Sequence, residues 1–351
     1  MRNRFGAFVA SVLVAAAAAC GGSTPPAETG GTTPPATGAP PAETASLPPG
    51  PEPAPSAELA AGIKAFDGGN YGEARRQFEA AVKKDSKNYE AFFDLGQACE
   101  KLGDKPAAEA AYKGALSVRP DLDTAAAALS SMYIEGNRID DALAVGRTGL
   151  AKHPGSAALH ENLGIALATR GDQDAAIQEL EAALKITPTD PMFHLTLAHW
   201  LNAWHVRGAT PHLDAVRDVA KDVGLLASVG FEYRMAGEVD ACIKTFDKAI
   251  AMKDGGEVRT ERALCKLANK DEKGCLDDLQ AAVAKEPSYP AAHYYLGGRL
   301  AVTHHYKEAA AEYAKYLELA PTGSLAKNAS DRLKMAQEAA AKDKGGGGKK
   351  R

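Results

Sequence analysis

Small, large and proline residues recur along the middle of the chain at a spacing of about 34 residues. The clearest copy consists of Leu95, Gly96, Gly103, Ala108, Tyr112, Ala115 and Pro120. Other copies keep the same kinds of residue at the matching places, among them Gly62, Phe78, Gly164, Leu180, Pro188, Gly297, Tyr313 and Pro321. Such a period predicts a tandem array in which each copy folds as a pair of helices of about 12–15 residues.

The residue sizes within one copy have a direct physical interpretation. A small residue at the eighth position and another at the twentieth let the two helix backbones approach closely, and large residues beside them fill the remaining space. The late proline ends the second helix. Asp or Asn residues at the turn are expected to cap the second helix, namely Asn70, Asp104, Asn137 and Asp172.

Spacing and residue size together resemble the tetratricopeptide repeat over residues 55–323. The resemblance implies an all-α, right-handed superhelical solenoid of about eight helix-turn-helix units. The expected units are 55–88, 89–122, 123–156, 157–190, 191–222, 223–255, 256–289 and 290–323. The fifth and seventh are degenerate: the frame of the fifth slips near Gly208–Pro211, and the first helix of the seventh is polar. Residues 324–342 are expected to form a helix that caps the last unit.

The N-terminus has the features of an export signal. Arg2 and Arg4 precede the uncharged apolar run Phe5–Ala19, which is too short to span a membrane, so we expect residues 1–19 to be a signal peptide. The small residues before Cys20 resemble the bacterial lipoprotein signal, although Ala17 stands where that family usually has Leu. This resemblance implies a lipid on Cys20 and an outer-membrane location facing the periplasm. Cleavage near Ala19 by an ordinary signal peptidase is the alternative.

Two low-complexity segments flank the repeats. Residues 20–54 are rich in Pro, Gly and Thr and contain no Lys, Arg or aromatic residue, which predicts a disordered tether. Residues 343–351 form a short basic tail that we also expect to be disordered.

Charge and motifs argue against several functions. The chain has 41 Lys and Arg against 45 Asp and Glu, and this weakly acidic balance argues against binding to nucleic acid. No nucleophile motif, phosphate loop or zinc signature occurs, so we expect no enzyme activity, cofactor or metal. His194, His199, His205 and His212 cluster in the fifth unit, but their spacing favours structural packing over a metal site.

Four cysteines follow Cys20. Cys99, Cys242 and Cys275 stand where the repeat needs a core or small residue, which favours buried free thiols. An exported protein can also form disulfides, and a bridge would then lie among Cys242, Cys265 and Cys275.

The resemblance to the repeat family implies binding of proteins in a concave groove. Carrying over the family's groove positions gives a mainly apolar set that includes Phe66, Phe93, Ile165, Met192, Leu195, Phe231, Met235 and Tyr294. We therefore expect an apolar helix or extended segment of an envelope protein as partner, with Phe93, Phe231 and Tyr294 as anchors. The expected function is a scaffold that supports an envelope machine for pilus, secretion, motility or outer-membrane biogenesis. The alternative is an adaptor or regulator of peptidoglycan or proteolytic enzymes.

Overall fold

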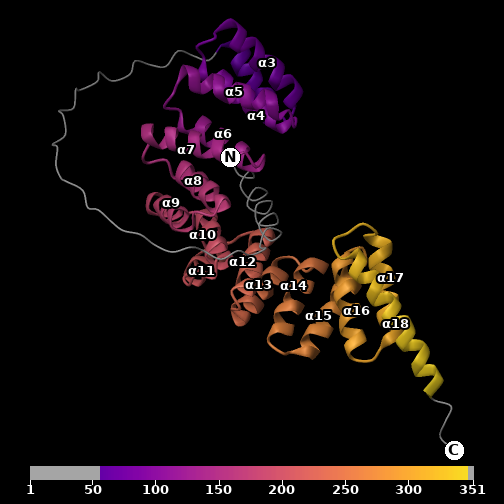
Figure 1. Cartoon of the computed structure of the whole chain (residues 1–351). Coiled ribbons are helices and arrows are strands. Elements are labelled where there is room, and N and C mark those ends of the chain that lie inside the picture. Colours follow the sequence, from indigo (N-terminus) through magenta and orange to yellow (C-terminus); the bar gives the residue numbers. More distant parts are fainter. Residues whose placement is uncertain (1–55, 347–351) are drawn as a thin grey trace, which may run out of the picture. The chain divides into compact units, whose positions relative to one another are not determined.

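A computed structural model describes residues 56–346 (Figure 1). The expected signal peptide, the lipidation site Cys20, the tether and the end of the basic tail lie outside these residues. The described part of the chain consists of seventeen helices, α2 to α18, and contains no strand. None of these helices is long and apolar enough to cross a membrane.

The chain divides into two compact units, and the division falls within α9 (Gln173–Ile186), between Glu179 and Leu180. In the N-terminal unit each helix from α2 to α7 packs on the next one along the chain. Its helices before α9 are α2 (Ala57–Asp67), α3 (Tyr71–Lys84), α4 (Tyr89–Lys101), α5 (Lys105–Val118), α6 (Asp123–Glu135), α7 (Ile139–Lys152) and α8 (Ala157–Arg170).

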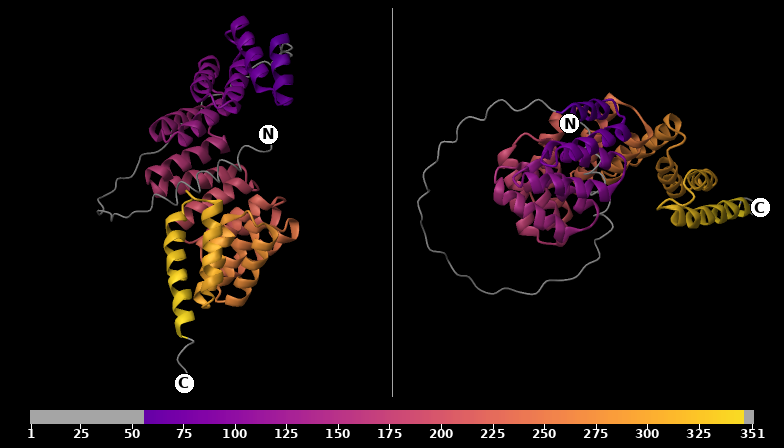
Figure 2. Two further views of the ribbon diagram at one scale, coloured as in Figure 1. Left: turned by 90° about the vertical axis from the view of Figure 1, so that its right-hand side faces the viewer. Right: turned by 90° about the horizontal axis from the view of Figure 1, so that it is seen from above.

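The C-terminal unit continues the same alternation after α9. Its helices are α10 (Pro191–Ala203), α11 (Ala209–Val219), α12 (Val223–Met235), α13 (Val239–Met252), α14 (Gly256–Ala268), α15 (Glu272–Lys285), α16 (Pro290–Val302), α17 (Tyr306–Leu319) and α18 (Ala326–Gly346). The helices before α18 form pairs that coincide with the eight expected repeats. The last helix, α18, packs along α17 as the expected cap (Figures 1 and 2) and runs to Gly346, beyond the expected end at residue 342.

Close packing between the two helices of a repeat follows the size rule read from the sequence. A Cβ atom added to Gly96 in α4 would lie 2.5 Å from the ring of Tyr112 in α5, and that ring is fully buried. The same contact recurs between Gly62 and Phe78 and between Gly230 and Phe246. The glycine is therefore required because the aromatic ring of the second helix occupies the space of a side chain.

The turns between paired helices agree only in part with expectation. The side chains of Asn70 and Asp104 accept backbone N–H bonds at the starts of α3 and α5, as predicted. Asn137 does not cap α7: it adopts a left-handed φ of 55°, and α7 begins after Arg138 without a side-chain cap. Asp172 accepts a hydrogen bond from the guanidinium of Arg170.

Cys242 in α13 and Cys265 in α14 form a disulfide bond, with Cα atoms 6.1 Å apart. The expectation of a free thiol is wrong for Cys242, because the second helix of one repeat packs on the first helix of the next and brings this residue to Cys265. The alternative, a bridge among the last three cysteines, is the one the structure shows. Cys99 and Cys275 are free and buried.

Candidate protein-binding face

Several first helices of successive repeats lie next to one another within each unit. In the C-terminal unit α10 contacts α12, α12 contacts α14 and α14 contacts α16, and in the N-terminal unit α2 contacts α4 and α6 contacts α8. We call the side that these helices form the first-helix face of each unit. The groove positions expected from the sequence all belong to first helices, so this face is the candidate binding surface.

Five of the eight predicted groove residues retain surface that a partner could reach. Met235 at the end of α12 is 58% exposed, an unusual value for a large apolar side chain. Phe66, Phe93, Met192 and Phe231 are half-buried. Their role in binding stays a prediction.

The other three predicted groove residues belong to the core. Ile165 and Leu195 are 2% and 1% exposed. They lie in the parts of α8 and α10 that are buried on all sides, and a helix with no exposed stripe offers no contact to a partner. The repeat frame places these residues on the groove side, but it does not show that neighbouring side chains cover them.

Tyr294 in α16 is also unavailable as an anchor, since it is 9% exposed. Its ring centroid lies 5.9 Å from that of Tyr313 and 5.6 Å from that of Tyr316 in α17. The guanidinium of Arg332 in α18 lies over the ring at 5.7 Å. The helix pair and the capping helix therefore enclose this side chain.

The accessible apolar residues of the C-terminal unit stand beside carboxylates that the sequence reading did not single out. The guanidinium of Arg234 lies 5.0 Å from the centre of the Phe231 ring. The same guanidinium approaches Glu261 of α14, with 3.4 Å between Nη2 and Oε2. Burial raises the pKa of the Glu261 carboxyl, and the neighbouring Glu257 raises it further. Glu257 is exposed one helical turn before Glu261, and we call these two residues the α14 carboxylate pair.

The N-terminal unit contains a second pair with the same spacing. Glu90 and Asp94 occupy the second and sixth positions of their repeat, as Glu257 and Glu261 do, and we call them the α4 carboxylate pair. Burial raises the pKa of Asp94 to about 6, with further contributions from the charges of Glu90 and Asp67. Phe93 lies beside Asp94 in the sequence, and its ring centroid is 5.7 Å from that of Tyr112.

The histidines of the fifth repeat make structural contacts. His194 Nδ1 lies 2.8 Å from His212 Nδ1, and His194 Nε2 lies 2.9 Å from the carbonyl oxygen of Pro188. His199 Nδ1 lies 2.9 Å from a carboxylate oxygen of the buried Glu232. Among residues 56–346 no group of three or more His, Cys, Asp or Glu side chains is placed to hold a metal ion.

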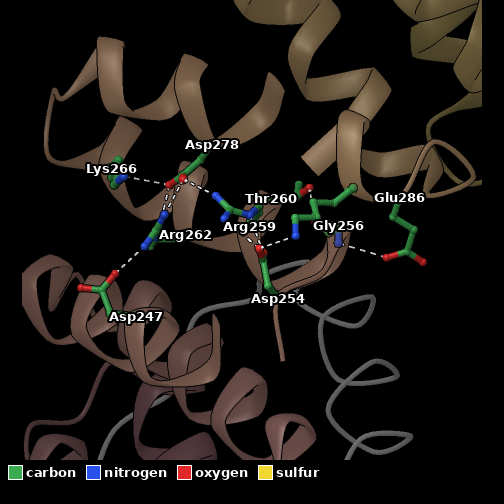
Figure 3. A network of polar contacts seen from close by, with 10 residues as sticks. Asp247, Asp254, Gly256, Arg259, Thr260, Arg262, Lys266, Asp278 and Glu286 are labelled. Carbon is green, nitrogen blue, oxygen red and sulfur yellow. Dashed lines mark hydrogen bonds and ion pairs between the residues drawn. The ribbon is translucent and has the colours of Figure 1, made fainter. Parts of the chain in front are cut away.

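A network of charged side chains explains why α14 is polar. Asp278 of α15 is 3% exposed and accepts hydrogen bonds from both Nε and Nη2 of Arg262 (Figure 3). Lys266 Nζ lies 2.8 Å from the same carboxylate, and Arg259 binds Asp254 through Nη2 at 2.9 Å. The bonds to Asp278 join the two helices of the seventh repeat, and the bond to Asp254 ties α14 to the loop before it, so these polar residues of α14 act in packing.

The sequence profile of the tetratricopeptide repeat matches residues 59–127, 128–191 and 276–324, which together make up about half of the chain. With the helix pairs described above, this match shows that the chain belongs to the tetratricopeptide repeat family. Members of this family typically act as non-enzymatic scaffolds that bind other proteins. No curated protein matches the chain.

Many solved structures share the fold. The crystal structure of yeast Tom70 is 14% identical with a TM-score of 0.52, over 82% of this chain and 64% of that chain. The structure of PilW, a type IV pilus biogenesis factor, is 20% identical with a TM-score of 0.49, over 55% of this chain and 91% of that chain. A tetratricopeptide repeat protein from Parabacteroides merdae is 16% identical with a TM-score of 0.46, over 80% and 97% of the two chains. At these identities the likeness concerns the fold alone.

Proposed function

We propose that this chain is a non-enzymatic scaffold of the bacterial cell envelope that captures another envelope protein on its first-helix face. A lipid on Cys20 anchors it in the outer membrane, and the Pro-rich tether holds the repeats in the periplasm. The captured protein belongs to an envelope machine for pilus, secretion, motility or outer-membrane biogenesis.

The observation that supports binding on this side is the accessible apolar surface of Phe93, Phe231 and Met235. Side chains of this kind dominate the energetics of protein interfaces, because burying an aromatic or Met side chain is worth about 1.5–3 kcal/mol. All three residues lie on first helices, where the repeat family also places its partners.

The proposed location rests on the N-terminal sequence and gains support from the cysteines. A basic head, a short apolar run and small residues before Cys20 fit a lipoprotein signal. The disulfide between Cys242 and Cys265 fits an oxidising compartment such as the periplasm, because cytosolic thiols are kept reduced.

The test is crosslinking in intact cells followed by purification of the tagged full chain. The double variant Phe93→Ala and Phe231→Ala should lose most of the captured partner while keeping its helical content. Tyr306→Ala, which changes a half-buried aromatic residue on the second helix α17, is the matched control and should capture the partner normally. Capture that survives the double change would place the binding surface elsewhere.

The identity of the captured protein separates the proposal from its alternative. A secretin, pilus subunit or other structural component supports the scaffold of an envelope machine. Recovery of a cell-wall hydrolase or a protease instead supports an adaptor or regulator of peptidoglycan or proteolytic enzymes.

A further inference from the structure

We propose that a partner segment bound on the first-helix face of either unit is cationic as well as apolar, with Lys or Arg side chains that lie against the carboxylate pair of that unit, on α4 or on α14. This inference rests on the proposed function, because it names the chemical class of the segment that the same face binds.

The α14 carboxylate pair carries more negative charge than its surroundings balance. Within the described residues Arg234 is the one cation in salt-bridge range of Glu261, and Glu257 has no ion pair. Glu261 Oε2 is buried and has no hydrogen bond, although Nη2 of Arg234 lies 3.4 Å away, and the Nε atom of Arg234 has no hydrogen bond either. Both groups are therefore incompletely satisfied in the free protein, and buried polar groups in this condition are costly.

The negative charge of the α14 carboxylate pair also raises the pKa values of two neighbouring tyrosines. Burial raises the pKa of Tyr289 to about 12, and the charges of Glu257 and Glu261 contribute to this rise. The pKa of Tyr295 is raised by burial and by Glu261, while Arg234 acts in the opposite direction. A cation from a partner would face two carboxylates of like charge, an arrangement that suits Lys and Arg.

The α4 carboxylate pair repeats this arrangement in the other unit. No ion pair or hydrogen bond to the side chain of Asp94 occurs in the described part of the chain, and the charges that act on it, Glu90 and Asp67, are both negative. Asp94 is half-buried, whereas Glu90 and Asp67 are exposed. A cation brought by a partner would relieve this repulsion at the point where Asp94 has lost much of its water.

Charge and apolar surface lie together in both units, which determines the kind of occupant. The α14 pair adjoins Phe231 through Arg234, and Met235 follows Phe231 by one helical turn. In the α4 pair, Glu90 precedes Phe93 by three positions and therefore shares its side of the helix. A purely apolar segment would leave the carboxylates unpaired and further desolvated, whereas a cationic amphipathic segment satisfies both kinds of surface.

The test measures binding of a labelled synthetic amphipathic peptide of about 18 residues, long enough for five helical turns, with Leu on one side and Lys on the other. The matched peptide carries Glu in place of every Lys. The full chain is compared with a variant in which both pairs are neutralised, by Glu90→Gln, Asp94→Asn, Glu257→Gln and Glu261→Gln. A control variant, Asp277→Asn with Glu338→Gln, removes carboxylates outside the two pairs. Both side chains are exposed and make no ion pair in the described structure.

The Lys peptide should bind the full chain at least about tenfold more tightly than the Glu peptide, and neutralising both pairs should remove this preference. The control should stay within about twofold of the full chain. Binding of the Lys peptide should also weaken between about pH 7.5 and about pH 5, because Asp94 with a pKa of about 6 takes up a proton in this range. Equal binding of the two peptides, or unchanged binding by the neutralised variant, overturns the inference.

Capture of the native partner in intact cells distinguishes failure of this inference from failure of the proposed function. Loss of the partner in the neutralised variant and in the double change of Phe93 and Phe231 to Ala supports both. If that variant keeps the partner while the double change of Phe93 and Phe231 to Ala loses it, the inference is wrong and the proposed function stands. If both variants keep the partner, neither stands.

Discussion

Replacing Gly96 by Ala should destabilise the second repeat, although Ala is ordinarily the better helix residue. The added Cβ would lie 2.5, 2.7 and 2.9 Å from three ring atoms of Tyr112. Ordinary contacts between carbon atoms lie at about 3.5–4.0 Å, so the ring must move by about 1 Å. It cannot do so freely, since it is fully buried and its hydroxyl donates a 2.7 Å hydrogen bond to Glu100.

The expected magnitude combines two opposing effects. Overpacking a well-filled core costs about 1–3 kcal/mol, and contacts with three ring atoms place this site at the upper end. Ala in a helix interior gains about 1 kcal/mol over Gly. Gly96→Ala should therefore lower the free energy of unfolding by about 2 kcal/mol.

Gly146 in α7 provides the matched control. It also lies inside a helix, but a Cβ there would find its nearest neighbour, Leu163, at 3.6 Å, an ordinary contact. Gly146→Ala should therefore stabilise by about 0.5–1 kcal/mol. Urea unfolding followed by circular dichroism measures both changes. In a Tyr112→Leu background the cost of Gly96→Ala should disappear, and the reasoning is refuted if Gly96→Ala is as stable as Gly146→Ala.

Three further predictions concern other parts of the chain. Replacing Cys242 and Cys265 by Ser should lower the free energy of unfolding in urea by about 3 kcal/mol, because the unfolded chain is no longer closed into a loop with a sequence separation of 23. A reducing agent should lower the stability of the original chain and leave that of the variant unchanged. Asp278→Asn should cost about 3 kcal/mol, the lower end for a broken buried pair, because Arg262 then keeps only the exposed Asp247 as its partner. The ion pairs with Arg262 and Lys266 lower the pKa of Asp278. The stability that its charge provides is therefore present above the pKa of the unfolded chain and is lost as the pH falls below about 4. Acid unfolding that is unaltered in the Asn variant would contradict this. Finally, Cys20→Ala should abolish lipid labelling and release the protein into the soluble periplasmic fraction, and a variant that stays in membranes would speak against the lipoprotein signal.

The repeat pattern predicts the helices well because it records direct steric requirements. Gly96 and Tyr112 are 16 positions apart in sequence and touch in the structure, so their sizes must be matched. Such a pair fixes the way the two helices meet. Asn137 shows the limit of this reasoning: Asn can cap a helix or adopt a left-handed turn, and here it adopts the turn.

The candidate site is less predictable from sequence because it depends on what covers each residue. Ile165 and Leu195 occupy groove positions of the repeat, yet both are buried, and Tyr294 is enclosed by α17 and α18. The carboxylate pairs could have been found by comparing polar residues between repeats, since Glu90 and Glu257 share the second position. An apolar strip along the repeats does not reveal them, because they are acidic. The pairing of Cys242 with Cys265 could not be predicted from the sequence alone, because it depends on how α13 packs on α14 of the next repeat.

The central claim is that the first-helix face binds the partner. Its most direct test places a photo-crosslinking amino acid at an exposed methionine of a first helix and, separately, at an exposed methionine of a second helix. Met235 ends the first helix α12 and is 58% exposed, while Met252 ends the second helix α13 and is 45% exposed. Irradiation of intact cells should link the native partner to position 235 and leave position 252 unlinked. Crosslinking from position 252 alone would show that the partner binds the opposite helices and would contradict the claim.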